Sequence, residues 1–168
     1  MSDADSTAFN KVTLTLANIA DGADEQLVLD GSTYALNTNS AAANTSGGAY
    51  QVTITNGGLT VEITKAGGAT LSETEVEALL NANLTYTNSS ENPSTATDRT
   101  ATIVVTDDGG QDSNSAVATI AVAAVNDAPE AADKTIGLPQ DTSHVLNASD
   151  FGFTDVDGDT LALSLIHI

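Results

Sequence analysis

Val52-Thr53-Ile54-Thr55-Asn56-Gly57-Gly58-Leu59-Thr60-Val61-Glu62-Ile63 is the stretch that decides the fold. Apolar residues alternate with polar ones on both sides of Asn56-Gly57-Gly58, and this period of two predicts two half-buried β-strands. Asparagine and glycine both tolerate positive φ, so an Asn-Gly pair between two such runs is a strong signal for a tight hairpin turn. The stretch therefore predicts two neighbouring antiparallel strands.

The same alternation recurs along most of the chain. At residues 11–16, valine and leucine occupy one face while lysine and threonine occupy the other. Threonine fills most outward positions, as β-branched residues do on the solvated face of a sheet. About eight short strands separated by turn signals predict an all-β fold, an antiparallel β-sandwich. Further strands are predicted at residues 27–29, 84–87, 100–106 (Ala101, Ile103 and Val105 inward) and 117–124 (Ala118, Ile120 and Val122 inward).

Residues 71–80 depart from the alternation and predict one short helix. Ser72 and Glu75 have the spacing of a capping box, in which each side chain bonds the backbone amide of the other residue. Apolar side chains further along share one helical face, so we expect the helix to pack over an open end of the sandwich. These side chains are Val76, Leu79 and Leu80.

The composition restricts the possible partners. The 168 residues suffice for one domain of common size with some residues left over, and they carry 23 acidic and 4 basic side chains, a formal net charge of −19. No cationic surface is available to displace counterions from phosphates, so we expect neither nucleic acid nor an anionic membrane as a partner. There is no cysteine, which excludes disulfides and thiolate metal sites. No apolar run approaches the length that crosses a membrane, and residues 1–5 lack the basic and apolar parts of an export signal.

Two acidic motifs lie toward the end of the chain, Val125-Asn126-Asp127-Ala128-Pro129 and Asp155-Val156-Asp157-Gly158-Asp159. Calcium is a hard cation that takes six to eight oxygen ligands from carboxylates, asparagine side chains and carbonyls. Proline pushes the residue before it toward extended backbone, so neighbouring side chains of the first motif point to opposite sides. Asn126 and Asp127 can then serve different ions, or one ion by side chain and another by carbonyl.

These motifs resemble the calcium-binding junction between successive cadherin-like domains, where an Asp-x-Asp binds calcium together with the preceding linker. Asp3-Ala4-Asp5 is similar to an earlier copy of the Asp-x-Asp, and Val105-Thr106-Asp107 resembles the family's Ala-x-Asp at the end of the penultimate strand. Asp98-Arg99-Thr100 matches the family's Asp-Arg-Glu only in part, because the glutamate is lost. The resemblance implies calcium ligands at Asp3, Asp5, Asn10, Asp98, Asp107, Asn126, Asp127, Asp155 and Asp157.

The stretch from Asp3 to Pro129 looks more closely like the cadherin-like repeats of giant repetitive bacterial adhesins. That resemblance implies a Greek-key sandwich of the cadherin or immunoglobulin type, Ca²⁺ as the cofactor, neighbouring repeats of the same chain as partners, and an extracellular or bacterial cell-surface location. Any export signal would lie outside these residues. The resemblance is carried by Ala20-Asp21-Gly22-Ala23-Asp24-Glu25, Leu84-Thr85-Tyr86-Thr87-Asn88, Val105-Thr106-Asp107-Asp108-Gly109-Gly110 and Val125-Asn126-Asp127-Ala128-Pro129.

The implied organisation has three parts. Residues 1–124 form a cadherin-like sandwich whose first strand is missing, residues 125–129 form a calcium-type linker, and residues 130–168 are the N-terminal fragment of the next repeat. We expect two weak strands in the last part, at 134–138 and 143–146. The chain is then a window of a tandem array and serves as a calcium-stabilised structural spacer or adhesion repeat, not as an enzyme. Neither a cysteine nucleophile nor a Gly-x-Ser-x-Gly or phosphate-binding loop is present.

Several local alternatives remain open. Asp107-Asp108-Gly109-Gly110 is also an ordinary turn sequence, because aspartate caps its own turn and glycine takes positive φ, so Asp107 is a turn residue, a calcium ligand, or both. The acids of the earlier turn are expected to be solvated rather than to bind anything. They are Asp21, Asp24 and Glu25.

A different function also remains open. Residues 37–48 and 88–97 are expected to be loops, the first of them flexible over 42–48, and loops on a rigid scaffold often carry binding residues. The chain would then be a module that binds a glycan or a surface protein. In a third interpretation, the acids serve only solubility.

Overall fold

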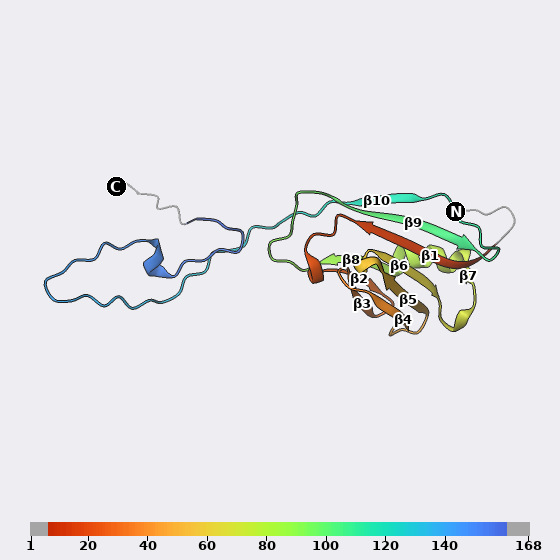
Figure 1. Cartoon of the computed structure of the whole chain (residues 1–168), viewed down its shortest axis with the longest axis horizontal. Coiled ribbons are helices and arrows are strands. Elements are labelled where there is room, and N and C mark those ends of the chain that lie inside the picture. Colours follow the sequence, from red (N-terminus) through yellow and green to blue (C-terminus); the bar gives the residue numbers. More distant parts are fainter. Residues whose placement is uncertain (1–6, 161–168) are drawn as a thin grey trace. The chain divides into compact units, whose positions relative to one another are not determined.

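The computed structural model describes residues 7–160 and divides the chain into two compact units, Met1–Ala123 and Ala124–Ile168 (Figure 1). The named strands β1 to β10 all belong to the first unit. In the described part of the second unit, the regular structure consists of a short 3₁₀ helix at Ala148–Phe151 and a bridge between Glu130 and Thr154.

The first unit is a β-sandwich of two antiparallel sheets. The larger sheet has the order β10-β9-β1-β6-β5-β4, with β7 pairing beside β1, and the smaller sheet has the order β3-β2-β8. Because β1 lies between β6 and β9, the chain crosses between distant strands and does not form a simple meander. The predicted all-β antiparallel sandwich with one short helix is thus confirmed. The strands are β1 (Ala8–Ala17), β2 (Glu25–Leu29), β3 (Ser32–Ala35), β4 (Ser40–Asn44), β5 (Tyr50–Thr55), β6 (Thr60–Lys65), β7 (Leu71–Ser72), β8 (Leu84–Asn88), β9 (Arg99–Asp107) and β10 (Ala116–Ile120).

The hairpin predicted around Asn56 is confirmed. Strands β5 and β6 pair in register from Tyr50 opposite Lys65 to Thr55 opposite Thr60. Asn56 and Gly57 both take positive φ, 54° and 69°, which is the conformation that this pair of residues favours in a hairpin turn.

The predicted helix is also confirmed, as α1 (Glu73–Ala78). Its first turn carries the full capping box, in which Ser72 Oγ accepts from the Glu75 amide and the Glu75 carboxylate accepts from the Ser72 amide. Leu79 is fully buried together with Val76, as predicted. Leu80 is different, because the chain leaves α1 through a π-helical turn, Leu79–Asn83, and this turn directs Leu80 toward solvent with 37% of its surface exposed.

The Glu75 carboxylate of the capping box makes the free energy of unfolding depend on pH in the acid range. The Lys65 ammonium, 2.6 Å from Glu75 Oε1, and the Ser72 amide together lower the pKa of Glu75 to about 2. A lowered folded-state pKa contributes stability above the unfolded value of 4.5, and this contribution is lost as the pH falls toward 2. We expect Glu75→Gln to flatten this part of the pH–stability curve, measured by urea unfolding at stepped pH. An unchanged slope in the variant would contradict the assignment.

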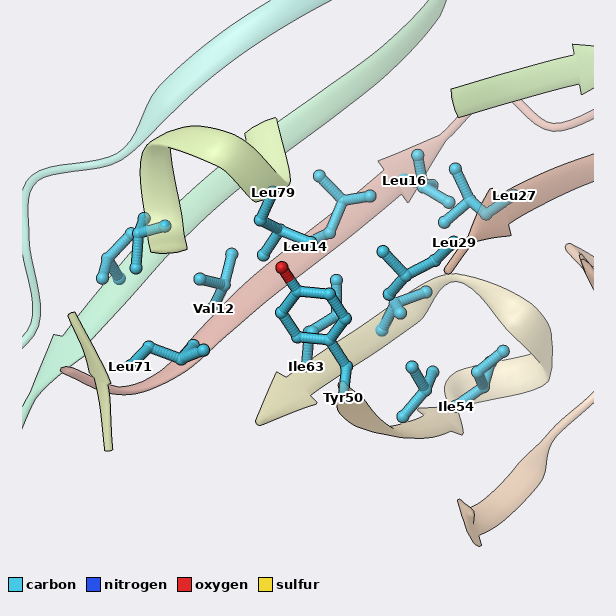
Figure 2. Close-up of a cluster of buried hydrophobic side chains, with 14 of the residues drawn as sticks. Val12, Leu14, Leu16, Leu27, Leu29, Tyr50, Ile54, Ile63, Leu71 and Leu79 are labelled. Carbon is cyan, nitrogen blue, oxygen red and sulfur yellow. The ribbon is translucent and has the colours of Figure 1, made fainter. Parts of the chain in front are cut away.

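The hydrophobic core lies between the sheets and under α1. Figure 2 shows Val12, Leu14 and Leu16 of β1 converging with side chains from β2, β5 and β6 and with Leu79. Each apolar side chain buried in this way contributes about 1.5–3 kcal/mol of transfer free energy. The buried apolar residues are Phe9, Val12, Leu14, Leu16, Leu27, Leu29, Leu36, Tyr50, Val52, Ile54, Val61, Ile63, Leu71, Val76, Leu79 and Val105.

Two expectations about the first unit are wrong. Residues 42–48 are not a flexible loop, because β4 covers the first of them and a turn fastened to Asp30 covers the rest. The strand predicted at 117–124 ends at Ile120. Of its predicted inward residues, Ala118 and Ile120 do lie on the face of β10 toward the other sheet, but Ala118 is exposed, and Ile120 and Val122 are half-buried.

The second unit is less regular than predicted. Residues 134–138 and 143–146 form no strands, and the side chains of Leu138, Val145 and Leu146 are 56%, 83% and 65% exposed. A short segment with few apolar partners cannot bury these side chains by itself, which explains why the weak alternation produces no sheet here.

Candidate metal centre

The linker motif and the Asp-x-Asp motif meet in the second unit. Glu130 and Thr154 exchange two backbone hydrogen bonds, at 2.8 and 2.9 Å, and this bridge brings the two segments together. The Asp127 amide then donates to Asp157 Oδ2 at 2.7 Å. Two motifs that are far apart in the sequence thus share one local site.

The Asp-x-Asp segment is organised around Asp155. Its Oδ1 accepts from the amides of Asp157 and Asp159, both at 3.0 Å, so the carboxylate is fixed by its own loop. Its Oδ2 is buried and has no hydrogen-bond partner among the described residues. A buried carboxylate oxygen without a donor fits the all-oxygen ligand set of a hard cation such as Ca²⁺.

The remaining predicted ligand of the linker does not join this arrangement. Asn126 is exposed, and its side-chain amide donates to the carbonyl of Asp127 at 2.9 Å. Within residues 7–160, no three acidic or histidine side chains gather closely enough to hold a metal ion without rearrangement. The carboxylates that would bind Ca²⁺ in the second unit are those of Asp127, Asp155 and Asp157.

Among the described residues, the predicted ligands of the first unit lie at opposite ends of β9, with Asn10 and Asp107 at one end and Asp98 at the other. Asp107 ends β9 opposite Phe9, and a bulge in β1 next to Phe9 contains the exposed Asn10. Asp107 is a turn residue, since its Oδ1 accepts from the Gln111 amide at 2.7 Å and its carbonyl accepts from Gly110. Asp3 and Asp5 lie outside the described residues, so the proposed grouping with Asp107 stays a prediction.

At the other end of β9, the side chain that forms ion pairs is that of Arg99, next to Asp98. Asp98 is exposed, and its carbonyl accepts from the side-chain amide of Asn18 at 2.9 Å. The Arg99 side chain, 1% exposed, forms ion pairs with Glu25 and with Asp21. Its Nε donates to Glu25 Oε1 at 2.7 Å, and its Nη2 donates to Asp21 Oδ2 at 2.7 Å.

The expectation of a solvated acidic turn is therefore wrong for Asp21 and Glu25, whereas Asp24 is exposed as expected. The side chains of Glu25 and Asp21 are 0% and 9% exposed. Burial alone would raise the pKa of Asp21, but hydrogen bonds from Ser94 and Asn88 and the charge of Arg99 outweigh burial and lower the pKa. Burial, together with the neighbouring Glu25 charge, raises the pKa of the Tyr86 hydroxyl. In this buried ion cluster of Arg99, Glu25 and Asp21, Arg99 bonds one oxygen of each carboxylate. Glu25 Oε2 and the Tyr86 hydroxyl are buried without a hydrogen-bond partner among the described residues.

No protein-family model, curated protein or solved structure matches this chain. Among the described residues, no helix is long and apolar enough to cross a membrane.

The hypothesis of a glycan- or protein-binding module depends on the loops at residues 37–48 and 88–97. Hydrogen bonds to the sandwich hold both loops in place. Asp30 Oδ2 accepts from Thr45 Oγ1 at 2.5 Å and from the Ala49 amide at 2.9 Å, which fixes the turn after β4. In the loop over 88–97, the Ser94 amide donates to Asp21 Oδ1 at 2.9 Å, and the Thr97 carbonyl accepts from Arg99 at 3.2 Å. Both loops are thus tied to side chains of the sandwich.

Proposed function

We propose that this chain is a calcium-stabilised structural spacer, an adhesion repeat of the cadherin-like type found in secreted or surface-attached bacterial adhesins. The observation that carries the proposal is the hydrogen bond from the Asp127 amide to Asp157. It joins the linker to the Asp-x-Asp, the two motifs on which the sequence resemblance depends.

The charge of the chain supplies the mechanism. With a net charge of −19, the acidic side chains repel one another. Asp127, Asp155 and Asp157 lie on two segments that the Asp127 amide and the Glu130–Thr154 bridge bring together. Bound Ca²⁺ would neutralise these carboxylates and take up the unpartnered Asp155 Oδ2. The linker would then be fixed to the unit that follows it, and a chain of such units would stiffen. The partners in this proposal are neighbouring repeats of the same polypeptide outside the cell.

Thermal unfolding of the full chain in excess EDTA and in millimolar Ca²⁺ tests the proposal. We expect Ca²⁺ to raise the Tm, because a ligand that binds only the folded state stabilises it by mass action. Asp155→Asn should remove most of the rise, whereas the matched control Asp133→Asn, at an exposed acid of the same unit, should keep it. Equal melting temperatures with and without Ca²⁺, together with no heat in calorimetric titration, would overturn the proposal.

A further inference from the structure

An apolar groove remains open in the first unit between the edges of the two sheets. The smaller sheet has only three strands, so it leaves part of the inner face of β9 and β10 without a facing strand. The groove has a volume of about 400 Å³ and is lined entirely by uncharged residues. Leu80, Leu84 and Tyr86 line it on one side, and Ala101, Ala118 and Ile120 line it on the other.

One wall of the groove is a free strand edge. In the described residues, β8 pairs with β2 on one side only. The Ser89 amide donates to the Asp24 carbonyl, while the Glu25 carbonyl accepts from Leu36 on the far side of β2. Because backbone groups alternate along a strand, Thr85 and Thr87 face β2, and the amides of Tyr86 and Asn88 point to the open edge. Such an edge is a template for one more strand.

The two ends of the groove carry acids. Glu77 lies one helical turn before Leu80 and is exposed. Asp98, also exposed, directly precedes Arg99, which is paired with Ile120 of the groove wall. A strand that enters this groove therefore meets apolar side chains along its length and negative charge at both of its ends.

A second copy of this chain is a poor occupant. Both copies would carry a net charge of −19, and three of the four basic side chains are already paired with acids. Lys11 pairs with Glu62, Lys65 pairs with Glu75, Arg99 is buried, and Lys134 donates to the Ser149 carbonyl. Charge complementarity thus favours a segment of a different protein.

We propose that this groove is a strand-acceptor site for another protein. Its occupant is an extended, uncharged segment with apolar residues at alternate positions and lysine or arginine at both ends. The segment adds to β8 as a fourth strand of the smaller sheet, pairing through its backbone with Tyr86 and Asn88 and facing its apolar side chains toward β9 and β10. Backbone pairing supplies affinity, and the apolar positions and charged ends supply selectivity.

A labelled synthetic peptide of sequence Lys-Thr-Val-Thr-Val-Thr-Lys, titrated into the full chain, tests this proposal. We expect saturable binding with a Kd below about 1 mM, together with slowed hydrogen exchange at the amides of Tyr86 and Asn88. The same peptide with glutamate at both ends should bind at least about tenfold more weakly at low salt, and the difference should shrink as salt is raised. Absence of binding, or protection confined to β10, would overturn the proposal.

Two variants of β10 separate groove binding from attachment elsewhere. Ala118→Glu places a carboxylate in the groove, and Thr119→Glu places one on the opposite face of the same strand. Both positions are exposed, so both variants should melt like the parent chain. Ala118→Glu should weaken peptide binding by about tenfold or more, and Thr119→Glu should leave it within about twofold. Equal effects of the two substitutions would show that the peptide does not occupy the groove.

Discussion

Arg99→Met should destabilise the sandwich by about 3–5 kcal/mol, because it leaves the fully buried Glu25 and the nearly buried Asp21 without their cation. Methionine keeps much of the volume of the arginine side chain, so the loss reports on charge and hydrogen bonding more than on a cavity. Urea unfolding followed by circular dichroism measures the effect.

Two further variants make this result specific. Combining Arg99→Met with Glu25→Met should recover part of the lost stability, because one uncompensated buried charge is then removed. Lys11→Met breaks an ion pair whose side chains are 38% and 40% exposed, and solvent screening limits that loss to about 1 kcal/mol or less. If Arg99→Met and Lys11→Met cost the same, the buried ion cluster does not contribute as argued.

Gly58→Ala should cost about 3 kcal/mol or more. Gly58 has φ of 98°, and a Cβ at this position would lie 2.3 Å from the carbonyl carbon of Leu36 and 2.6 Å from the amide nitrogen of Asn37. Both are backbone atoms, which cannot rotate away as a side chain does, so the strain of the turn and the clash add together. To relieve the clash, the turn between β5 and β6 would have to move away from Leu36 and Asn37, which follow β3.

The neighbouring glycine provides the control. Gly57 also has positive φ, 69°, but a Cβ there would meet nothing within 4 Å. Gly57→Ala should therefore cost only the free energy of placing a residue with a Cβ at positive φ, about 1–2 kcal/mol. Thermal or urea unfolding of the two variants compares them directly. Equal losses would show that the close approach to Leu36 and Asn37 does not matter.

Much of the fold could be predicted from the alternation of residues. The hairpin at Asn56, the strand β1 and the capping box of α1 follow from local patterns that tertiary structure leaves intact. Strands β3 and β4 were missed because alanine, serine and asparagine at residues 32–44 alternate weakly. Their pairing comes from neighbouring strands, which a local pattern does not contain.

The buried ion cluster could have been predicted from the sequence. Glu25 has the same phase as Leu27 and Leu29, and Arg99 has the same phase as Ala101 and Val105. An acid and the single arginine of the chain, each at an inward position, indicate a buried pair. The turn sequence around Asp21-Gly22 instead favours solvent exposure of the neighbouring acids, and this local signal led to the wrong prediction for Asp21 and Glu25.

The candidate metal centre was predicted only in part. The motif spacing correctly indicated that the linker and the Asp-x-Asp come together, as the contact between Asp127 and Asp157 shows. The exposure of Asn126 could not be predicted, because it depends on which of two neighbouring side chains the linker turns inward. At Asp98, whose side chain is exposed, the calcium ligand stays a prediction.

The pairing of β1, β9 and β10 has a mechanical consequence. Strand β10 runs parallel to β1, with β9 between them, so Ala8 and Ile120 lie at opposite ends of this three-strand ribbon. Tension that enters at Ala8 and leaves at Ile120 acts along the strands and loads their hydrogen bonds in shear, all at once. A hairpin pulled open from one end would instead release its bonds one after another. The first unit is therefore arranged to resist stretching.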